Sequence, residues 1–520
     1  MTISTCADII RTYAREKPDA TCIVFGERRI SWSALHEKAK RLAQAMVSEG
    51  VGATEHVAFI DKNGPEYFEF QFGVAMLNAV TVNVNWRLAA PEIEYTINDA
   101  KAKVLIVGPE FYDSIEQIEK NLATVTKIVA LGEHPRWEGY EDWCARQPAT
   151  DPMVTSGPGD ICVQLYTSGT TGLPKGVMLM NSNLFTLLPN VSRSWGLSAP
   201  DCVNLVCMPL FHIGGAGWAL GGMLNGAVTV LIREFVAHQV LDALVEHNVT
   251  TALFVPAMLG VLAMVPGAAE RTYPIRTVNY GASPITNETL LAAMRTFKCE
   301  FNQMYGMTET TGAITQLDAA DHDPDGPRSG LLRSAGKPYS WVEARVVDME
   351  TGTDCRPGAV GELWTRSPQN MLGYWANPEA TAATITTEGW LKTGDAGYFD
   401  EGGYLFLTDR VKDMIVSGAE NVYPAEVENA LASHPAIAEV AVIGVPSERW
   451  GETVKAVVAL RPGQLATAPQ IIAFAKERLA GYKCPTSVDF IDVLPRNPSG
   501  KVLKKDLREP YWAGRERRIN

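Results

Sequence analysis

Short apolar runs, each about as long as a β-strand, alternate with amphipathic helical patterns along the first half of the chain. Residues 35–48 and 66–78 repeat apolar side chains at helical spacing, whereas His56–Ile60 and Val104–Val107 are short apolar runs. The alternation continues through residues 205–208, 228–232, 241–247 and 252–255. Strands that alternate with helices form parallel sheets with helices on their faces, so we predict an α/β fold.

The pattern changes twice in the second half of the chain. From about residue 345 short strands are separated by glycine-rich turns, which is typical of an all-β subdomain. After Arg410 a helix, two strands and a helix follow, over residues 426–433, 439–444, 454–460 and 471–479. We predict a large N-terminal domain, 1–410, with two parallel βα subdomains and a β-barrel-like subdomain. A small, mobile α+β lid domain, 411–520, follows it, with a hinge at the boundary.

Charge and cysteine content exclude several classes of function. A net charge of -13 argues against a nucleic-acid partner, because phosphate backbones require a basic surface. The nine cysteines form no Cys-x-x-Cys pair, which favours reduced thiols in the cytoplasm, and residues 1–15 do not resemble a secretory signal. Residues 202–232 carry no formal charge, but Pro209, His212 and many glycines argue against a transmembrane segment.

The strongest local signal is the segment YTSGTTGLPKG at residues 166–176, directly after the apolar run 161–165. Its glycines allow close backbone approach, and its hydroxyls, free N–H groups and lysine suit phosphate oxygens. It lacks the Gly-x4-Gly-Lys-Ser/Thr pattern of P-loop NTPases. The residues predicted to bind phosphate are Thr167, Ser168, Gly169, Thr170, Thr171 and Lys175.

Six further segments follow in order: PLFH at 209–212, YGAS at 280–283, NQMYGMTET at 302–310, KTGD at 392–395, DR at 409–410 and PSGK at 498–501. Together with residues 166–176 they resemble the adenylate-forming enzymes, a family that includes acyl-CoA synthetases, aryl-CoA ligases, luciferases and peptide-synthetase adenylation domains. The resemblance covers nearly the whole chain. It implies that ATP activates a carboxylic acid as an acyl-adenylate, from which the acyl group passes to coenzyme A.

The resemblance also implies the nucleotide site. The adenine is expected along Gly281, Ala282, Ser283, Asn302, Gln303, Met304, Tyr305 and Gly306. Thr308 is expected at the α-phosphate. Glu309 is expected to hold Mg²⁺, which prefers a hard carboxylate ligand when it bridges phosphates. Asp395 and Arg410 match the residues that contact the ribose.

The remaining implied roles lie in the last quarter of the chain. Lys412 occupies the hinge position, and Lys501 matches the lysine that bridges the acid and a phosphate oxygen while charge builds in the transition state. Ser417 and Gly418 are expected to reach the CoA nucleotide after rotation of the small domain. Trp450 either flanks the pantetheine tunnel, as in aryl-CoA ligases, or is an ordinary core or surface tryptophan.

The acid pocket is expected at His212, Ile213, Gly214, Trp218 and Met307. Amino-acid-activating relatives carry an aspartate in the segment from Phe211 to Trp218, and this chain has none there. An apolar acid therefore fits the uncharged lining. The glycines of this segment leave room for a chain or ring, whereas Trp218 would shorten the cavity. His212 either gates the pocket or is a buried histidine with its own partners.

We favour a fatty acid as substrate, with an aryl or aryl-alkenyl acid as the second choice. A carrier-protein thiol instead of CoA, and luciferase-like oxygenation, are rivals within the family. A nucleotide-binding protein without catalysis is disfavoured because Lys175, Glu309, Asp395, Arg410 and Lys501 are all present. The sequence leaves open whether the protein is a monomer or a homodimer.

Overall fold

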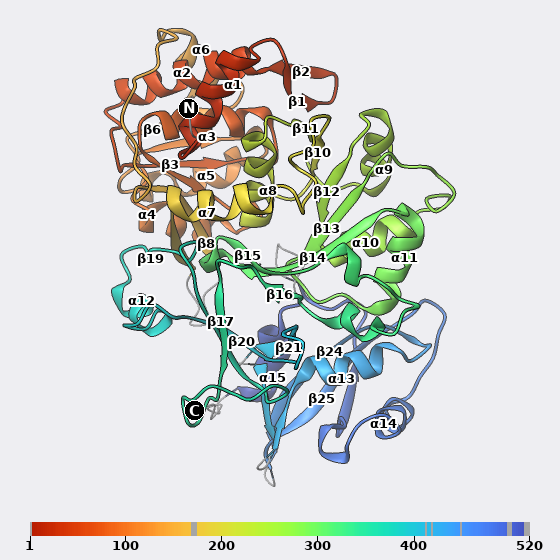
Figure 1. Cartoon of the computed structure of the whole chain (residues 1–520). Helices are drawn as coiled ribbons and strands as arrows, with labels where there is room; N and C mark the ends of the chain where they lie inside the picture. Colours follow the sequence, from red (N-terminus) through yellow and green to blue (C-terminus); the bar gives the residue numbers. More distant parts are fainter. Residues whose placement is uncertain are drawn as a thin grey trace.

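The computed structural model describes residues 3–167, 174–410, 413–417, 420–447, 450–496 and 502–513. For residues 409, 410, 416, 420 and 421 it describes the backbone alone. A large body contains the N-terminal part of the chain, and a smaller lobe at the bottom of Figure 1 contains the C-terminal part. The α/β class with a large and a small domain is confirmed.

An eight-stranded mixed sheet organises the first βα subdomain, in the order β19-β9-β8-β4-β3-β5-β6-β7. The strands from β8 to β7 pair in parallel, and β9 and β19 add antiparallel pairs at one edge. They are β3 (His56–Ile60), β4 (Val80–Asn83), β5 (Val104–Val107), β6 (Lys127–Ala130), β7 (Glu138–Gly139), β8 (Ile161–Thr167), β9 (Lys175–Met180) and β19 (Gly373–Tyr374). The strands predicted at His56–Ile60 and Val104–Val107 are confirmed.

A nine-stranded sheet organises the second subdomain, in the order β16-β15-β14-β13-β12-β10-β11-β1-β2. Its central strands are parallel, and β2, β15 and β16 are antiparallel. They are β1 (Thr21–Phe25), β2 (Arg28–Ser31), β10 (Val203–Val206), β11 (Val228–Leu231), β12 (Thr251–Phe254), β13 (Thr277–Gly281), β14 (Glu300–Met307), β15 (Gly312–Leu317) and β16 (Lys337–Pro338).

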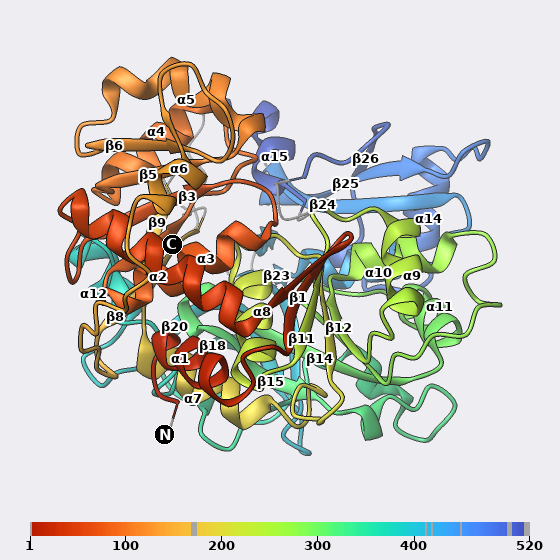
Figure 2. The ribbon, with the colours of Figure 1, turned by 90° about the horizontal axis from the view of Figure 1, so that it is seen from above.

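Helices cover both faces of each sheet, so the body is layered (Figures 1 and 2). The layer between the sheets contains α1 (Cys6–Glu16), α2 (Trp32–Ser48), α3 (Pro65–Met76), α6 (Tyr140–Ala145), α7 (Asn181–Val191) and α8 (Ile213–Leu224). The outer faces carry α4 (Ala90–Asp99) and α5 (Tyr112–Ile118) on one sheet, and α9 (Ala237–Glu246), α10 (Pro256–Met264) and α11 (Asn287–Phe297) on the other.

Strand β3 shows why these segments read as apolar runs. Val57 and Phe59 pack against the middle helices, whereas Ala58 and Ile60 pack into the cluster that contains α4 and α5. A parallel strand covered on both faces has no polar side, so its sequence does not alternate.

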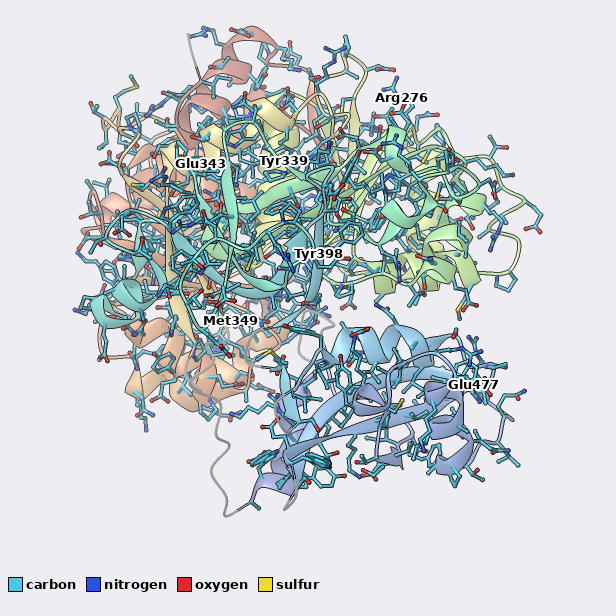
Figure 3. All side chains as sticks on the ribbon, turned by 60° about the horizontal axis from the view of Figure 1, so that its bottom comes forward. Arg276, Tyr339, Glu343, Met349, Tyr398 and Glu477 are labelled. Carbon is cyan, nitrogen blue, oxygen red and sulfur yellow. The ribbon has the colours of Figure 1, made fainter. Side chains whose placement is uncertain are left out.

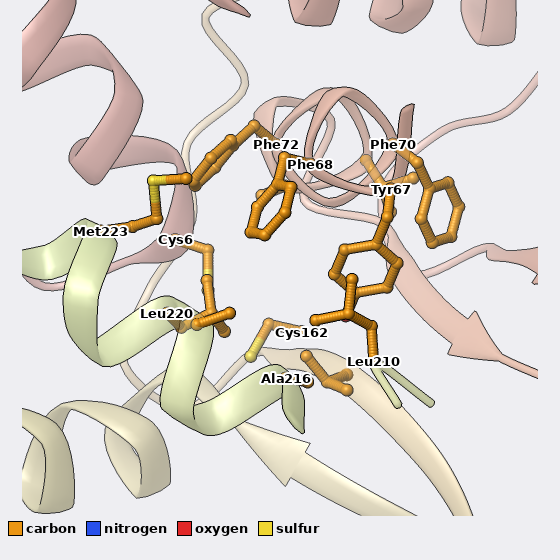
Figure 4. Packing of buried hydrophobic residues seen from close by; sticks show 14 of the residues in the cluster. Cys6, Tyr67, Phe68, Phe70, Phe72, Cys162, Leu210, Ala216, Leu220 and Met223 are labelled. Carbon is orange, nitrogen blue, oxygen red and sulfur yellow. The ribbon is translucent and has the colours of Figure 1, made fainter. Parts of the chain in front are cut away.

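Helix α3 lies at the centre of the body. Its side chains Tyr67, Phe68, Phe70 and Phe72 are buried among residues of α8, β8 and the loop before α8 (Figure 4). A helix that is apolar all round is typical of a position between layers. The buried carboxyl of Glu69 is an exception, and the hydroxyl of Tyr140 donates a hydrogen bond to its Oε2 at 2.7 Å.

Glu69 makes the stability of the body depend on pH. Burial raises the pKa of Glu69 from 4.5 to about 7, against the hydrogen bond from Tyr140 that lowers it. A raised pKa means that the fold favours the protonated acid, so this contribution is complete below about pH 4.5 and is lost as the pH rises through about 7. The shift corresponds to roughly 3 kcal/mol.

We therefore expect Glu69→Gln to unfold at temperatures that change less between pH 5 and pH 8 than those of the unchanged protein. Thermal unfolding followed by circular dichroism at both pH values measures this difference. Equal pH dependence in the two proteins would contradict the assignment.

The predicted all-β subdomain is a four-stranded antiparallel sheet in the order β17-β18-β20-β21, an open order rather than a closed barrel. Its strands are β17 (Glu343–Val347), β18 (Gly361–Arg366), β20 (Leu391–Phe399) and β21 (Leu405–Arg410), with α12 (Pro378–Thr384) inserted after β19. Glu343 and Tyr398 of this sheet lie on the large body in Figure 3.

The C-terminal lobe has its own sheet and core, and Glu477 marks it in Figure 3. Its elements are β22 (Ile415–Ser417), β23 (Glu420–Val422), α13 (Pro424–Ala432), β24 (Ile437–Ser447), β25 (Gly451–Leu460), α14 (Ala468–Lys476), β26 (Ser487–Phe490) and α15 (Lys504–Trp512). The helix, two strands and helix predicted here are present. The boundary at 410/411 remains our proposal.

The uncharged stretch 202–232 forms β10, α8 and β11 within the body. Nowhere in the described part of the chain is a helix both long and apolar enough to cross a membrane.

Candidate active site

The phosphate segment and the predicted metal ligand meet where the two large sheets adjoin. Thr167 ends β8 of the eight-stranded sheet, and Glu309 lies in the short turn Thr308–Thr310 that follows β14 of the nine-stranded sheet. The Thr167 hydroxyl donates to Glu309 Oε1 at 3.2 Å. Residues 142 positions apart in sequence are therefore in contact. Ser168, Gly169, Thr170 and Thr171 lie outside the described residues.

A tyrosine that lies outside the predicted motifs completes this contact. Tyr374 on β19 donates its hydroxyl to the same Oε1 of Glu309, at 3.0 Å. Lys175, the first residue of β9, places its ammonium 4.9 Å from the centroid of the Tyr374 ring. The predicted phosphate lysine and metal ligand thus share one neighbour.

The surroundings of Glu309 fit a magnesium ion that also binds phosphate. Glu309 is 6% exposed, and among the described residues both hydrogen bonds to its side chain reach Oε1, so none occupies Oε2. The described residues contain no group of three acidic, histidine or cysteine side chains that would hold a metal unaided. Mg²⁺ in nucleotide sites is usually held by one or two carboxylates together with substrate phosphates.

The predicted adenine segment begins at Gly281, the last residue of β13. Gly281 pairs with Met304 of β14, and a Cβ at Gly281 would lie 2.1 Å from the Met304 carbonyl oxygen. Only glycine fits this close approach of two strands. Ala282 adopts a left-handed backbone with φ of 68°, an uncommon conformation for a residue with a side chain, and such conformations cluster at ligand sites. Ser283 beside it is half-buried.

The residues of β14 divide between the core and the site. Asn302 is buried and donates from Nδ2 to the Ser194 carbonyl oxygen at 2.8 Å, so it ties the strand to the loop after α7. Gln303 has a buried Oε1 without a hydrogen-bond partner in the described structure, and this oxygen is available to a ligand N–H group. Met304 is buried, whereas Tyr305, Gly306, Met307 and Thr308 are half-buried.

The predicted ribose aspartate lies beside the predicted adenine strand. The Tyr305 hydroxyl donates to Asp395 Oδ2 at 2.6 Å, and Asp395 is 7% exposed on β20. Arg410 pairs with Asp395 across the antiparallel strands β20 and β21. The side chain of Arg410 is not described. The two motifs predicted to share the ribose are thus adjacent in the sheet.

The predicted acid-pocket residues separate into two groups. His212, Ile213 and Gly214 at the start of α8 are half-buried, as is Met307. Trp218 is 2% exposed and donates from Nε1 to the Leu205 carbonyl oxygen at 2.9 Å, so it packs in the core behind these residues.

The glycines of α8 mostly serve close packing. A Cβ at Gly215 would lie 2.1 Å from the Pro209 carbonyl oxygen, and one at Gly222 would lie 2.5 Å from Asn204 Nδ2. At Gly217 the nearest atom would be Ile213 Cδ1, at 3.5 Å. Of these three glycines, Gly217 alone leaves ordinary van der Waals space.

The predicted CoA residues that are described lie together in the lobe. Ser417 pairs with Gly451, the neighbour of Trp450, and Trp450 is 47% exposed. Gly418, Lys412 and Lys501 lie outside the described residues. Arg496 and Val502, on either side of the segment with Lys501, form an antiparallel bridge.

Comparison with known proteins identifies the family of the chain. The model of the AMP-binding enzyme family matches residues 10–375, and the model of its C-terminal domain matches residues 426–501. The chain belongs to the family of AMP-binding enzymes, and the ligase class predicted from the sequence is confirmed.

Relatives are similar along their whole length. The chain is 39% identical over 523 residues to the fatty acid–[acyl-carrier-protein] ligase ScoC of Streptomyces coeruleorubidus, covering 100% of this chain and 98% of the relative. It is 38% identical over 506 residues to the indoleacetate–CoA ligase of Aromatoleum aromaticum, covering 96% and 97%. The crystal structure of ATP-bound MatB from Rhodopseudomonas palustris has a TM-score of 0.88 at 29% identity, covering 97% and 99%. The names of the two ligases state different acids and different acceptors.

Proposed function

We propose that this chain is an AMP-forming acyl-CoA ligase that converts an apolar carboxylic acid, ATP and CoA to acyl-CoA, AMP and pyrophosphate. The contact of Thr167 and Tyr374 with Glu309 is the observation that carries the proposal. It joins the phosphate segment to a carboxylate suited to Mg²⁺, beside Asp395 and Tyr305 at the predicted ribose and adenine positions.

In the first half-reaction a carboxylate oxygen of the acid attacks the α-phosphorus of ATP, and pyrophosphate leaves. The chain contributes alignment and charge rather than a nucleophile. Lys175 and the segment 167–171 hold the phosphates, Thr308 contacts the α-phosphate, and Lys501 bridges the acid and a phosphate oxygen. Glu309 would hold Mg²⁺, which would supply positive charge to the phosphates.

In the second half-reaction the CoA sulfur attacks the acyl carbonyl carbon, and AMP leaves with the oxygen that came from the acid. Rotation about Lys412 replaces Lys501 with Ser417, Gly418 and Trp450. Residues 411–520 carry 15 Lys and Arg against 13 Asp and Glu, whereas residues 1–410 carry 31 against 46. The near-neutral lobe repels an anionic acceptor less than the acidic body does.

For the acid we favour a fatty acid. The residues of α8 carry no charge, Ile213 and Met307 are apolar and half-buried, and a Cβ at the buried Gly217 would only contact Ile213 at 3.5 Å. The name of ScoC, which is 39% identical, adds support for a fatty acid. An aryl acid is the second candidate, supported by the similarity to the indoleacetate–CoA ligase.

The acceptor has one rival, the phosphopantetheine thiol of a carrier protein, which the name of ScoC supports. A panel of fatty, aryl and amino acids with ATP and Mg²⁺, followed by pyrophosphate and AMP release with and without CoA, separates the two. We expect saturable CoA dependence with a fatty acid. Pyrophosphate release that does not depend on CoA, together with transfer of the acyl group to a carrier protein, would show that the carrier protein is the acceptor instead of CoA.

Asp395→Ala is expected to weaken use of ATP. A carboxylate that accepts from both ribose hydroxyls makes two charge-assisted bonds, each of about 1.5–3 kcal/mol. We expect the KM for ATP to rise at least about tenfold, with a smaller change in kcat. Initial rates over a range of ATP concentrations measure both.

Asp354→Ala is a matched control for Asp395→Ala, because Asp354 is an exposed aspartate of the same subdomain, 3.4 Å from Arg345 in an ion pair. The control should behave like the unchanged protein. An unchanged KM for ATP in Asp395→Ala would remove Asp395 from the site.

We further propose a cytoplasmic location, which is supported by the free thiols of all nine cysteines. A homodimer is a further proposal, and sedimentation of the purified protein tests it.

A further inference from the structure

We infer that Tyr374 is a positioning residue for phosphate activation: its hydroxyl orients the Glu309 carboxylate for the metal, and its ring holds the Lys175 ammonium toward the phosphates. The inference rests on the proposed function for the roles of Glu309 and Lys175, and adds a residue that supports both. In this inference Tyr374 acts through Glu309 and Lys175.

The hydroxyl of Tyr374 selects one oxygen of the carboxylate. Together with Thr167 it donates to Oε1 of Glu309, at 3.0 and 3.2 Å. Two donors on one oxygen fix the rotation of the carboxylate and direct Oε2 away from them. Ligand carboxylates of metals are commonly held in this way by a second hydrogen-bonding shell, and loss of such a partner typically weakens metal binding.

The ring of Tyr374 acts on the neighbouring charge. The Lys175 ammonium lies 4.9 Å from the ring centroid, within the range of a cation–π interaction. Tyr374 is 8% exposed, and such interactions are stronger where water is excluded. The contact with the ring thereby restricts the flexible side chain of Lys175.

The segment 369–374, which we call the brace, holds the Glu309 turn through its backbone as well. The Met371 N–H donates to the Glu309 carbonyl oxygen at 2.8 Å. The fully buried Gln369 donates from Nε2 to the carbonyl oxygens of Thr310 and Ala313, both at 2.8 Å. The brace therefore places Tyr374 in a fixed relation to the turn, so a change at its hydroxyl acts on the carboxylate and not on the path of the chain.

Two substitutions separate the two contacts. Tyr374→Phe removes the hydroxyl and keeps the ring, whereas Tyr374→Leu removes both. Tyr140→Phe is the matched control, because Tyr140 is also a buried tyrosine that donates to a glutamate, at 2.7 Å from Glu69, and it lies outside the site. The control reproduces the loss of a buried hydroxyl.

The readout is nucleotide binding without any acid. The α,β-methylene analogue of ATP is titrated calorimetrically into each full-length protein, with Mg²⁺ at a series of concentrations and with a chelator. For Tyr374→Phe we expect the Mg²⁺ concentration at half-effect to rise at least about tenfold, with binding in chelator unchanged. For Tyr374→Leu we expect weaker binding in chelator as well, by about threefold.

Tyr374→Phe with the Mg²⁺ dependence of the unchanged protein would overturn the inference, and so would an equal effect of Tyr140→Phe. Binding by the unchanged protein that ignores Mg²⁺ would overturn it together with the metal role of Glu309. If no acid supports pyrophosphate release, the proposed function fails, while the binding comparison still decides the role of Tyr374.

Discussion

Lys501→Ala is expected to lower acyl-adenylate formation by about a hundred- to a thousandfold, the usual loss when a donor to developing transition-state charge is removed. In the proposed mechanism Lys501 contacts both the attacking carboxylate and a phosphate oxygen, so its contribution is largest while the pentavalent phosphorus forms. In the same proposed mechanism the nucleophile of the second half-reaction is the CoA thiol, and rotation removes Lys501 before that step. Thioester formation from supplied acyl-adenylate should therefore persist.

Both half-reactions are measured separately, the first by pyrophosphate release and the second by thioester formation from synthetic acyl-adenylate. Lys505→Ala is the control, because Lys505 is another lysine of the same tail, on α15. If Lys501→Ala keeps both half-reactions, the catalytic role assigned to Lys501 is wrong. Equal loss of both would indicate damage to the lobe instead.

The second large effect is expected for Glu309→Gln. The amide oxygen still accepts hydrogen bonds from Thr167 and Tyr374, so the turn keeps its packing, but the negative charge that we propose binds Mg²⁺ is lost. Metal stabilisation of phosphoryl charge contributes several kcal/mol, and we expect adenylate formation to fall at least about a hundredfold. Thioester formation from acyl-adenylate should change little.

Pyrophosphate release over a range of Mg²⁺ concentrations measures the loss in Glu309→Gln. Glu343→Gln is the control, because Glu343 forms an ion pair with Arg366 at the surface, 2.7 Å away. We propose no role in phosphate binding for Glu343. A Mg²⁺ dependence in Glu309→Gln equal to that of the unchanged protein would mean that the metal is held elsewhere.

The sequence predicted best those elements that are buried on both faces. β3 and β5 have the predicted bounds because polar residues and turns limit each run. α3 ends at Met76, earlier than predicted, since Asn78 takes a left-handed backbone with φ of 53°. β10 begins at Val203, earlier than predicted, because the buried Asn204 lies in the strand although its side chain is polar.

The sequence could propose site residues where residue types repeat a familiar motif, as at Thr167, Glu309 and Asp395, and the structure brings Thr167 into contact with Glu309. The motifs did not identify Tyr374. It belongs to a strand of two residues, and its role depends on the pairing of β19 with β9, which brings it to Lys175. The packing of Trp218 was likewise hidden, because only the fold shows that its indole N–H bonds to Leu205 in the core.

The most direct test of the central claim follows oxygen from the acid. A fatty acid labelled with ¹⁸O in its carboxylate is incubated with the protein, ATP, Mg²⁺ and CoA, and the products are analysed by mass spectrometry. Attack of the carboxylate on the α-phosphorus predicts one ¹⁸O atom in AMP and none in pyrophosphate. Unlabelled AMP, or label in a released phosphate, would contradict an acyl-adenylate and with it the proposed ligase mechanism.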